Sequence, residues 1–170
     1  MTPELARVMA RYNRWMNEKL YAVAAELTDA ERKQDRGAFF GSIHRTLNHL
    51  LVADRIWLGR FTAAALEEGE LGPGGIRALD QELFADFDEL LRERAATDDA
   101  LDAFVATLTA EKLAADLRYV RRGVVNAFPL WHAVAHAFNH QTHHRGQVTT
   151  LLVQAGRDPG VTDLVAMLRG

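Results

Sequence analysis

The sequence predicts an all-α fold, an antiparallel four-helix bundle that forms a single domain over residues 1–170. Four long stretches carry apolar residues at the three- and four-residue spacing of an amphipathic helix. A Gly-Pro-Gly-Gly segment, Gly72 to Gly75, separates the second stretch from the third and indicates a loop. A chain of 170 residues buries roughly 70% of its unfolded surface, so the fold requires neither a metal nor a disulfide.

The first two predicted helices have clear apolar stripes. The first is expected from about Pro3 to Leu27, because a proline in the first turn loses no hydrogen bond. The second is expected from about Ser42 to Glu68, where apolar residues again recur at helical spacing. The stripe of this second helix consists of Ile43, Leu47, Leu50, Leu51, Trp57, Leu58 and Phe61.

A third helix and a short hairpin are predicted next. The helix is expected over about Leu79 to Leu108, with a local break at Asp98-Asp99. Two short runs rich in β-branched and aromatic residues, Leu117 to Val120 and Val124 to Phe128, flank an Arg-Arg-Gly turn. This pattern predicts a β-hairpin before the last long helix.

The fourth long helix is predicted from about Leu130 to Gln154. It is expected to end near Gly156, since glycine is the residue most common just after a helix C-terminus. In the tail that follows, Asp163 to Leu168 are expected to add a short helical turn.

The composition restricts the classes of function. The formal net charge is −3 with both signs interspersed, which lacks the basic surface of a nucleic-acid binder. Because the chain has no cysteine, any metal site must use imidazole and oxygen ligands. The N-terminal residues lack the apolar core of a signal peptide, and charged residues interrupt every apolar segment. We therefore expect a cytoplasmic protein that binds neither nucleic acid nor membrane.

Five of the seven histidines lie in the short stretch from Trp131 to Gln147. His136, His140 and His144 recur at every fourth residue, so a helix places their imidazoles along one face, beside the apolar stripe. Two histidines at this spacing can direct ring nitrogens at one cation. The alternative interpretation is that they are partly exposed helix histidines without a function.

A third ligand is expected from the second helix, which contains His44 and His49. These histidines lie on opposite flanks of the apolar stripe, and helical geometry does not decide between them. Asp54 lies on the stripe, so its carboxylate is predicted to contact Arg145 or the second nitrogen of a metal-bound histidine. The alternative is an ion pair at the edge of the core without a role in the site. A His-Glu-x-x-His peptidase is disfavoured, because no glutamate lies between the histidines of the fourth helix.

Several segments together resemble the DinB/YfiT-like family of metal-dependent proteins. The run HLLVADRIWL, His49 to Leu58, is similar to the second helix of that family, and HQTHHRGQ, His140 to Gln147, resembles its most characteristic string. The opening segment Tyr12 to Asn17 and the closing segment Leu151 to Gly160 are similar to the same family. The resemblance therefore covers nearly the whole chain.

This resemblance implies a four-helix bundle, often a homodimer, with a divalent ion such as zinc or nickel held by three histidines with open coordination positions. The implied ligands here are His49, His140 and His144, and His136 then becomes a residue of the pocket. Relatives that use low-molecular-weight thiols imply a metal-dependent enzyme such as a thiol-dependent S-transferase, acting on an unidentified small molecule with an external thiol. The alternatives are a non-catalytic metal-binding or stress-associated protein and a metal-dependent hydrolase.

Further residues are expected near the metal ligands. His136, Gln147, Asp54 and His143 are predicted to lie beside the ligands or to line the pocket. Arg145 is expected to pair with a carboxylate. No catalytic residue is identified from the sequence. Weaker candidates for contact with a substrate are Asn13, Trp15, Asn17 and His132.

Overall fold

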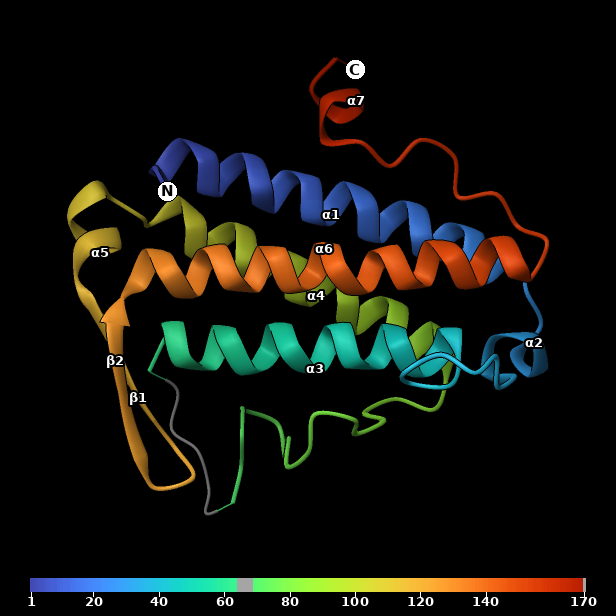
Figure 1. Cartoon of the computed structure of the whole chain (residues 1–170), viewed down its shortest axis with the longest axis horizontal. Coiled ribbons are helices and arrows are strands. Elements are labelled where there is room, and N and C mark those ends of the chain that lie inside the picture. Colours follow the sequence, from blue (N-terminus) through green and yellow to red (C-terminus); the bar gives the residue numbers. More distant parts are fainter. Residues whose placement is uncertain (64–68, 170) are drawn as a thin grey trace.

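Four long helices pack side by side into a bundle in the computed structural model, which describes residues 1–63 and 69–169 (Figure 1). The predicted all-α four-helix bundle is confirmed. Within the described ranges, no helix is both long and apolar enough to cross a membrane. The long helices are α1 (Pro3–Ala25), α3 (Ile43–Phe61), α4 (Phe87–Ala106) and α6 (Leu130–Gln154).

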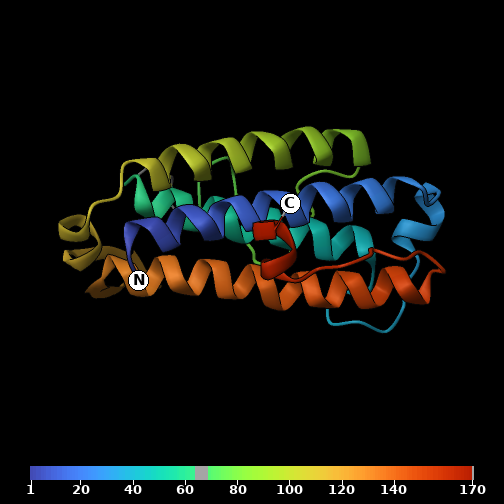
Figure 2. The same ribbon diagram turned by 90° about the horizontal axis from the view of Figure 1, so that it is seen from above.

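The helices do not simply alternate in direction along the chain. α1 and α6 run one way, whereas α3 and α4 run the other way (Figures 1 and 2). The neighbours α3 and α4 are parallel, since Arg55 Nε lies 3.3 Å from Thr97 Oγ1 and Phe61 stacks on Phe104 further along both helices. A parallel pair cannot be joined by a tight turn, so its connection must return along the bundle.

Shorter helices and a β-hairpin complete the fold. The predicted hairpin is confirmed, because β1 (Asp116–Arg121) pairs antiparallel with β2 (Val124–Pro129). Its two-residue turn, Arg122-Gly123, has φ angles of 51° and 73°, and positive φ at both positions matches the twist of the strands. The short helices are α2 (Asp29–Lys33), α5 (Ala110–Ala114) and α7 (Leu164–Arg169), the last of which agrees with the helical turn predicted in the tail.

The helix α6 has the boundaries that the sequence predicted. Its C-terminus closes with a Schellman motif, in which Gly156 N–H donates to Val153 O and Arg157 N–H donates to Leu152 O, both at 2.9 Å. Gly156 has a φ of 75°, a left-handed conformation that glycine adopts without a steric penalty. The whole histidine ladder therefore lies on one uninterrupted helix.

The helix α4 begins at Phe87, so its predicted start at Leu79 is wrong. Asn48 of α3 explains the difference, because its Oδ1 accepts hydrogen bonds from the N–H groups of Leu83 and Phe84 at 2.9 and 3.0 Å. These backbone groups bond to a side chain of another helix and not within a helix of their own. A non-helical segment therefore lies against α3 where a helix was expected.

Two other predictions about helix ends have different outcomes. α3 ends at Phe61, and residues 64–68 of the predicted second helix lie outside the described residues. The predicted break at Asp98-Asp99 is wrong, because α4 continues through both residues. Asp98 is buried and paired with a cation on its own helix, so it stabilises the helix that it was expected to interrupt.

Residues 69–86 pack closely against α3. Ile76 of this segment is fully buried and packs with Val52 and Ile56 of the helix. Gly72 comes so close to Ile56 that an added Cβ would lie 2.9 Å from Ile56 Cα. Glycine is therefore required at this contact, which holds the segment beside the helix.

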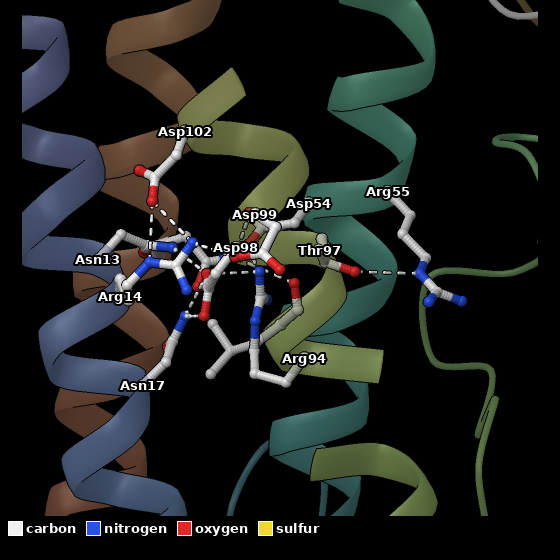
Figure 3. Close-up of polar contacts among 12 residues, drawn as sticks. Asn13, Arg14, Asn17, Asp54, Arg55, Arg94, Thr97, Asp98, Asp99 and Asp102 are labelled. Atoms are coloured by element: carbon white, nitrogen blue, oxygen red, sulfur yellow. Dashed lines mark hydrogen bonds and ion pairs between the residues drawn. The ribbon is translucent and has the colours of Figure 1, made fainter. Parts of the chain in front are cut away.

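A buried guanidinium joins three of the long helices (Figure 3). Arg94 of α4 is 2% exposed; its Nη1 lies 2.7 Å from Asp54 Oδ2 on α3, and its Nη2 lies 2.8 Å from Asp98 Oδ1. Burial alone lowers the pKa of Arg94, but the charges of the two carboxylates outweigh it and raise the pKa. Asn13 and Asn17 of α1 donate to Asp98 Oδ1 at 3.2 and 3.0 Å. The prediction that these amides contact a substrate is wrong, because they are used inside the bundle.

The fourth long helix joins the same network through Gln141. Its Nε2 donates to Asp54 Oδ1 at 2.5 Å and to Leu50 O at 3.0 Å. Because Gln141 directly follows His140, these two hydrogen bonds fix that turn of α6 against α3.

The predicted partners of two charged residues are wrong. The sequence predicts Arg145 or a ring nitrogen as the partner of Asp54, but Asp54 contacts Arg94 and Gln141, since α4 runs directly beside it. Arg145 was expected to pair with a carboxylate, but its Nη1 donates to the neutral amide of Asn13. Burial lowers the pKa of Arg145 to about 10.

Replacing Arg94 by methionine should destabilise the bundle strongly. Arg94→Met leaves Asp54 and Asp98 buried without their cation, so the free energy of unfolding should fall by about 3–5 kcal/mol. Urea unfolding followed by circular dichroism measures this change. The matched control is Arg92→Met on the exposed face of α4, which should alter stability by no more than about 0.5 kcal/mol. Similar effects of the two variants would contradict the role given to the network.

Candidate metal centre

Three histidines from two helices direct ring nitrogens at one another. His49 lies on α3, and His140 and His144 lie on successive turns of α6. Nε2 of His49 is 3.3 Å from Nε2 of His140 and 3.2 Å from that of His144, and the α6 pair is 3.1 Å apart. This group could hold a metal ion. His44 does not join it, because its Nε2 bonds to Phe84 O at 2.9 Å.

In His49 and His144 the ring nitrogen that points away from the cluster, Nδ1, carries the proton. His49 Nδ1 lies 2.7 Å from Leu79 O, and His144 Nδ1 lies 2.7 Å from Gln147 Oε1. A carbonyl oxygen only accepts hydrogen bonds, so each Nδ1 carries the proton and donates it. In a neutral imidazole the other nitrogen, Nε2, then has a free lone pair that points into the cluster.

The converging lone pairs fit a metal ion. Nε2 of His140 can donate a hydrogen bond to only one of its two neighbours. Without a cation, at least two Nε2 lone pairs therefore face each other at about 3 Å with no proton between them. Imidazole nitrogens bound at the usual distance to a tetrahedral zinc lie about 3.3 Å apart. The cluster has nearly this spacing already. Three imidazoles suit zinc and nickel, and also copper and iron.

Burial keeps these imidazoles neutral at pH 7. It is the main cause that lowers the pKa of His49 to about 4 and the pKa of His140 to about 3. The neighbouring imidazole of His144 lowers both values further, and burial lowers the pKa of His144 itself. Neutral imidazole is the form that binds a metal, so the ligands need not lose a proton first.

Two residues that support the cluster were not identified from the sequence. Phe40 stacks on the His49 ring, with centroids 3.9 Å apart and an interplanar angle of 22°. Leu79 supplies the carbonyl that orients the same ring, from the segment that the sequence predicted to be helical. The run Phe39-Phe40-Gly41 is the one sequence feature that could have marked the first of them.

A pocket with a volume of about 480 Å³ opens beside the cluster. Its size is in the range of small-molecule sites, and its walls combine apolar and polar side chains. The structure places His143 and Gln147 at this pocket, as the sequence predicts, and adds a carboxylate. Besides the three clustered histidines, the walls are formed by Phe39, Phe40, Leu79, Asp80, His143 and Gln147.

Other predicted site residues lie elsewhere. The ring centroid of His136 lies 5.1 Å from that of Trp57 and 6.0 Å from that of His140, one turn away from the cluster towards the hairpin. Asp54 does not line the pocket, because its carboxylate is used in the network around Arg94. Trp15 packs against the hydrophobic core, and its predicted contact with a substrate is not supported.

Comparisons with known proteins agree on one family. A sequence profile of the DinB family matches residues 1–170. Protein DinB of Bacillus subtilis (strain 168) is 25% identical over 164 residues, which cover 94% of this chain and 91% of the relative. The crystal structure of a DinB-like protein from Bacillus cereus ATCC 10987 has a TM-score of 0.62 and 23% identity, covering 87% of this chain and 91% of that one. At that identity the solved structure supports the fold alone.

The metal-free protein should lose stability as the pH falls from about 6.5 towards 4. The unfolded chain takes up protons on its histidines near pH 6.5, whereas folded His49 and His140 stay neutral down to a pKa of about 4 and about 3. Protons therefore favour the unfolded chain over this interval. Urea unfolding in the presence of a chelator, at several pH values, measures the slope.

The variant His140→Gln separates this effect from the titration of carboxylates. It should lose less stability than the wild type between pH 7 and pH 5, because one neutral, half-buried histidine with a lowered pKa is gone. His132→Gln, which replaces an exposed histidine outside the cluster, is the control and should keep the wild-type slope. An equal slope in His140→Gln and the wild type would contradict the prediction.

Proposed function

The chain belongs to the DinB family, and we propose that it is a metal-dependent enzyme that transfers an external low-molecular-weight thiol to an electrophilic small molecule. The observation that carries the proposal is the convergence of three histidine Nε2 atoms, within 3.1–3.3 Å of one another, at the wall of an open pocket. A closed structural site would surround its ion with four protein ligands, whereas three histidines beside a pocket leave a position for a reactant.

His49, His140 and His144 would hold the ion, with zinc or nickel as the first candidates. A divalent ion on three neutral imidazoles keeps its full charge and lowers the pKa of a thiol or a water molecule beside it. The Leu79 carbonyl and the Gln147 amide hold two of the rings at their Nδ1 atoms, so the ligands are oriented before a reactant arrives.

The thiol must come from outside, because the chain contains no cysteine. In the proposed transfer, the sulfur forms a bond to the electrophilic carbon, the bond from that carbon to its leaving group breaks, and the thiol proton is released. Asp80 and His143 line the pocket beside the cluster and are placed to accept this proton. Phe39 and Phe40 provide apolar walls for the carbon part of the reactants.

A metal-dependent hydrolase is the second candidate, and Asp80 is the observation that favours it. The sequence lacks the glutamate of a His-Glu-x-x-His site, but the structure brings the Asp80 carboxylate to the same pocket from the segment before α4. A carboxylate there could act as the general base for a water molecule. A homodimer stays a prediction from the resemblance, and a cytoplasmic location stays a prediction from the composition of the sequence.

The chain should bind about one zinc or nickel ion through the three histidines. After chelation and reconstitution, elemental analysis should find the metal in the wild type and in His143→Ala, which changes a pocket histidine outside the cluster. His140→Ala should lose most of the metal while circular dichroism shows the same helix content. A wild-type chain that takes up neither ion would contradict the proposal.

Turnover should depend on an added thiol. A panel of glutathione, bacillithiol and mycothiol with a chlorodinitrobenzene electrophile should give thioether product with the metal-loaded wild type and none with His140→Ala. The hydrolase candidate predicts instead a thiol-independent cleavage of an activated ester that falls by about 100-fold or more in Asp80→Asn. Metal binding without either activity would overturn both enzymatic proposals and favour a non-catalytic metal-binding protein.

A further inference from the structure

A second pocket lies between the hairpin and the helices α3 and α6. It has a volume of about 400 Å³ and shares no lining residue with the pocket at the histidine cluster. We call it the hairpin pocket. Its main walls are Trp57 of α3, Tyr119 and Arg121 of β1, Phe128 of β2, and His132 and His136 of α6.

Aromatic rings hold the walls of the hairpin pocket together. The ring centroid of Tyr119 lies 5.9 Å from that of Trp57 and 6.0 Å from that of Phe128, with edge-to-face angles of 79° and 85°. His132 stacks on Phe128 at 6.3 Å, and His136 packs against Trp57 at 5.1 Å. Such contacts fix the positions of the rings at the pocket.

Two arginines bring positive charge to this pocket. Cζ of Arg60 lies 4.5 Å from the ring centroid of Trp57 and 4.3 Å from that of Tyr119, two rings that line the pocket, although Arg60 itself does not line it. Burial is the main cause that lowers the Arg60 pKa, and the positive charge of Arg121, which lines the pocket, lowers it further. Among the described residues, none of the charges that shift the Arg60 pKa is a carboxylate. Glu70 lines a neighbouring cleft, together with Arg60 and Arg121, and does not line the hairpin pocket.

The hairpin pocket and the histidine cluster lie next to each other along one face of α6. His132 and His136 line the hairpin pocket, and His140 and His144 belong to the cluster, so the ladder continues from one to the other. His132 and His140 are eight positions apart, as are His136 and His144, and eight residues of an α-helix span about 12 Å along its axis. His136 and His140, the adjacent members, have ring centroids 6.0 Å apart.

We propose that the hairpin pocket binds the carboxylate or phosphate group of an elongated small molecule whose other end reaches the histidine cluster. A guanidinium recognises either group through paired, charge-assisted hydrogen bonds, and the aromatic walls contact the adjoining carbon skeleton. The anion site follows from the arginines and the rings alone. Only the statement that the other end reaches the cluster rests on the proposed metal-dependent function.

Direct binding to the metal-free full-length chain tests the anion site separately from any metal chemistry. Isothermal titration calorimetry should detect binding of phenyl phosphate or benzoate and none of neutral benzyl alcohol; the relative affinities of the two anions distinguish phosphate from carboxylate. The variant Arg60→Met with Arg121→Met should weaken binding at least about tenfold. Arg121→Met alone, at an exposed strand position, should weaken it measurably without a risk to the fold.

The matched control is Arg118→Met, which removes the same charge from the same strand. Arg118 does not line the pocket, since alternate residues of a strand face opposite sides and Arg121 shares its side with Tyr119. This variant should bind the anions as the wild type does. Equal affinity for benzyl alcohol, equal weakening in Arg118→Met, or no binding of either anion to the wild type would overturn the anion site.

A second titration tests the connection to the cluster. A mercaptoalkanoic acid long enough to span about 12 Å should bind the zinc-loaded chain more tightly than the metal-free chain, and Arg121→Met should remove part of that gain. Mercaptoacetate, which is too short, should show no effect of Arg121→Met on the zinc-loaded chain. If the long compound is equally insensitive to Arg121→Met, the two ends do not act together, although the anion site found in the first experiment would stand.

Discussion

The pairing of Arg94 with Asp54 and Asp98 is the interaction on which the rest of the bundle depends. A buried guanidinium is tolerated only where its charge is compensated, so α3 and α4 must meet at this one register. Gln141 extends the network to α6 by bonding to Asp54, one residue after a histidine of the cluster. The polar interior therefore also sets the position of α3 along α6, and with it which turn of α6 His49 faces. Figure 3 shows the part of this network that surrounds the guanidinium.

The histidine cluster is a preorganised arrangement that the bundle stabilises against the repulsion of its own lone pairs. The Leu79 carbonyl and the Gln147 amide oxygen each accept a hydrogen bond from the Nδ1–H of one imidazole, so the free nitrogens of those two rings face inward. Phe40 covers one ring, and burial keeps the imidazoles neutral. The parallel course of α3 and α4 contributes to this site, because the long connection between them brings residues 69–86 back along α3.

The histidine ladder of α6 serves two neighbouring pockets. Its C-terminal members, His140 and His144, belong to the cluster, while His136 and His132 face the aromatic rings of the hairpin pocket. A four-residue spacing repeats a side chain on one face of a helix, but it does not say which neighbour that face meets. Here α3 is a neighbour of both ends of the ladder, but the segment before α4 lies beside the cluster, whereas the hairpin lies beside His132 and His136. The same pattern therefore contributes to the proposed metal site at one end and to the proposed anion site at the other.

The sequence by itself determined the helices and the type of metal ligand. Apolar periodicity and Gly156 are local features, so they placed both ends of α6, and the absence of cysteine restricted the ligands to imidazole and oxygen. Helical geometry left His44 and His49 open, and only the family resemblance favoured the second. The tertiary structure decided the partner of Asp54, the start of α4 and the division of the ladder between two pockets. These features depend on contacts between distant segments, such as His49 and His140, which are 91 positions apart. Periodicity shows which face of a helix is apolar, whereas only packing shows what that face meets.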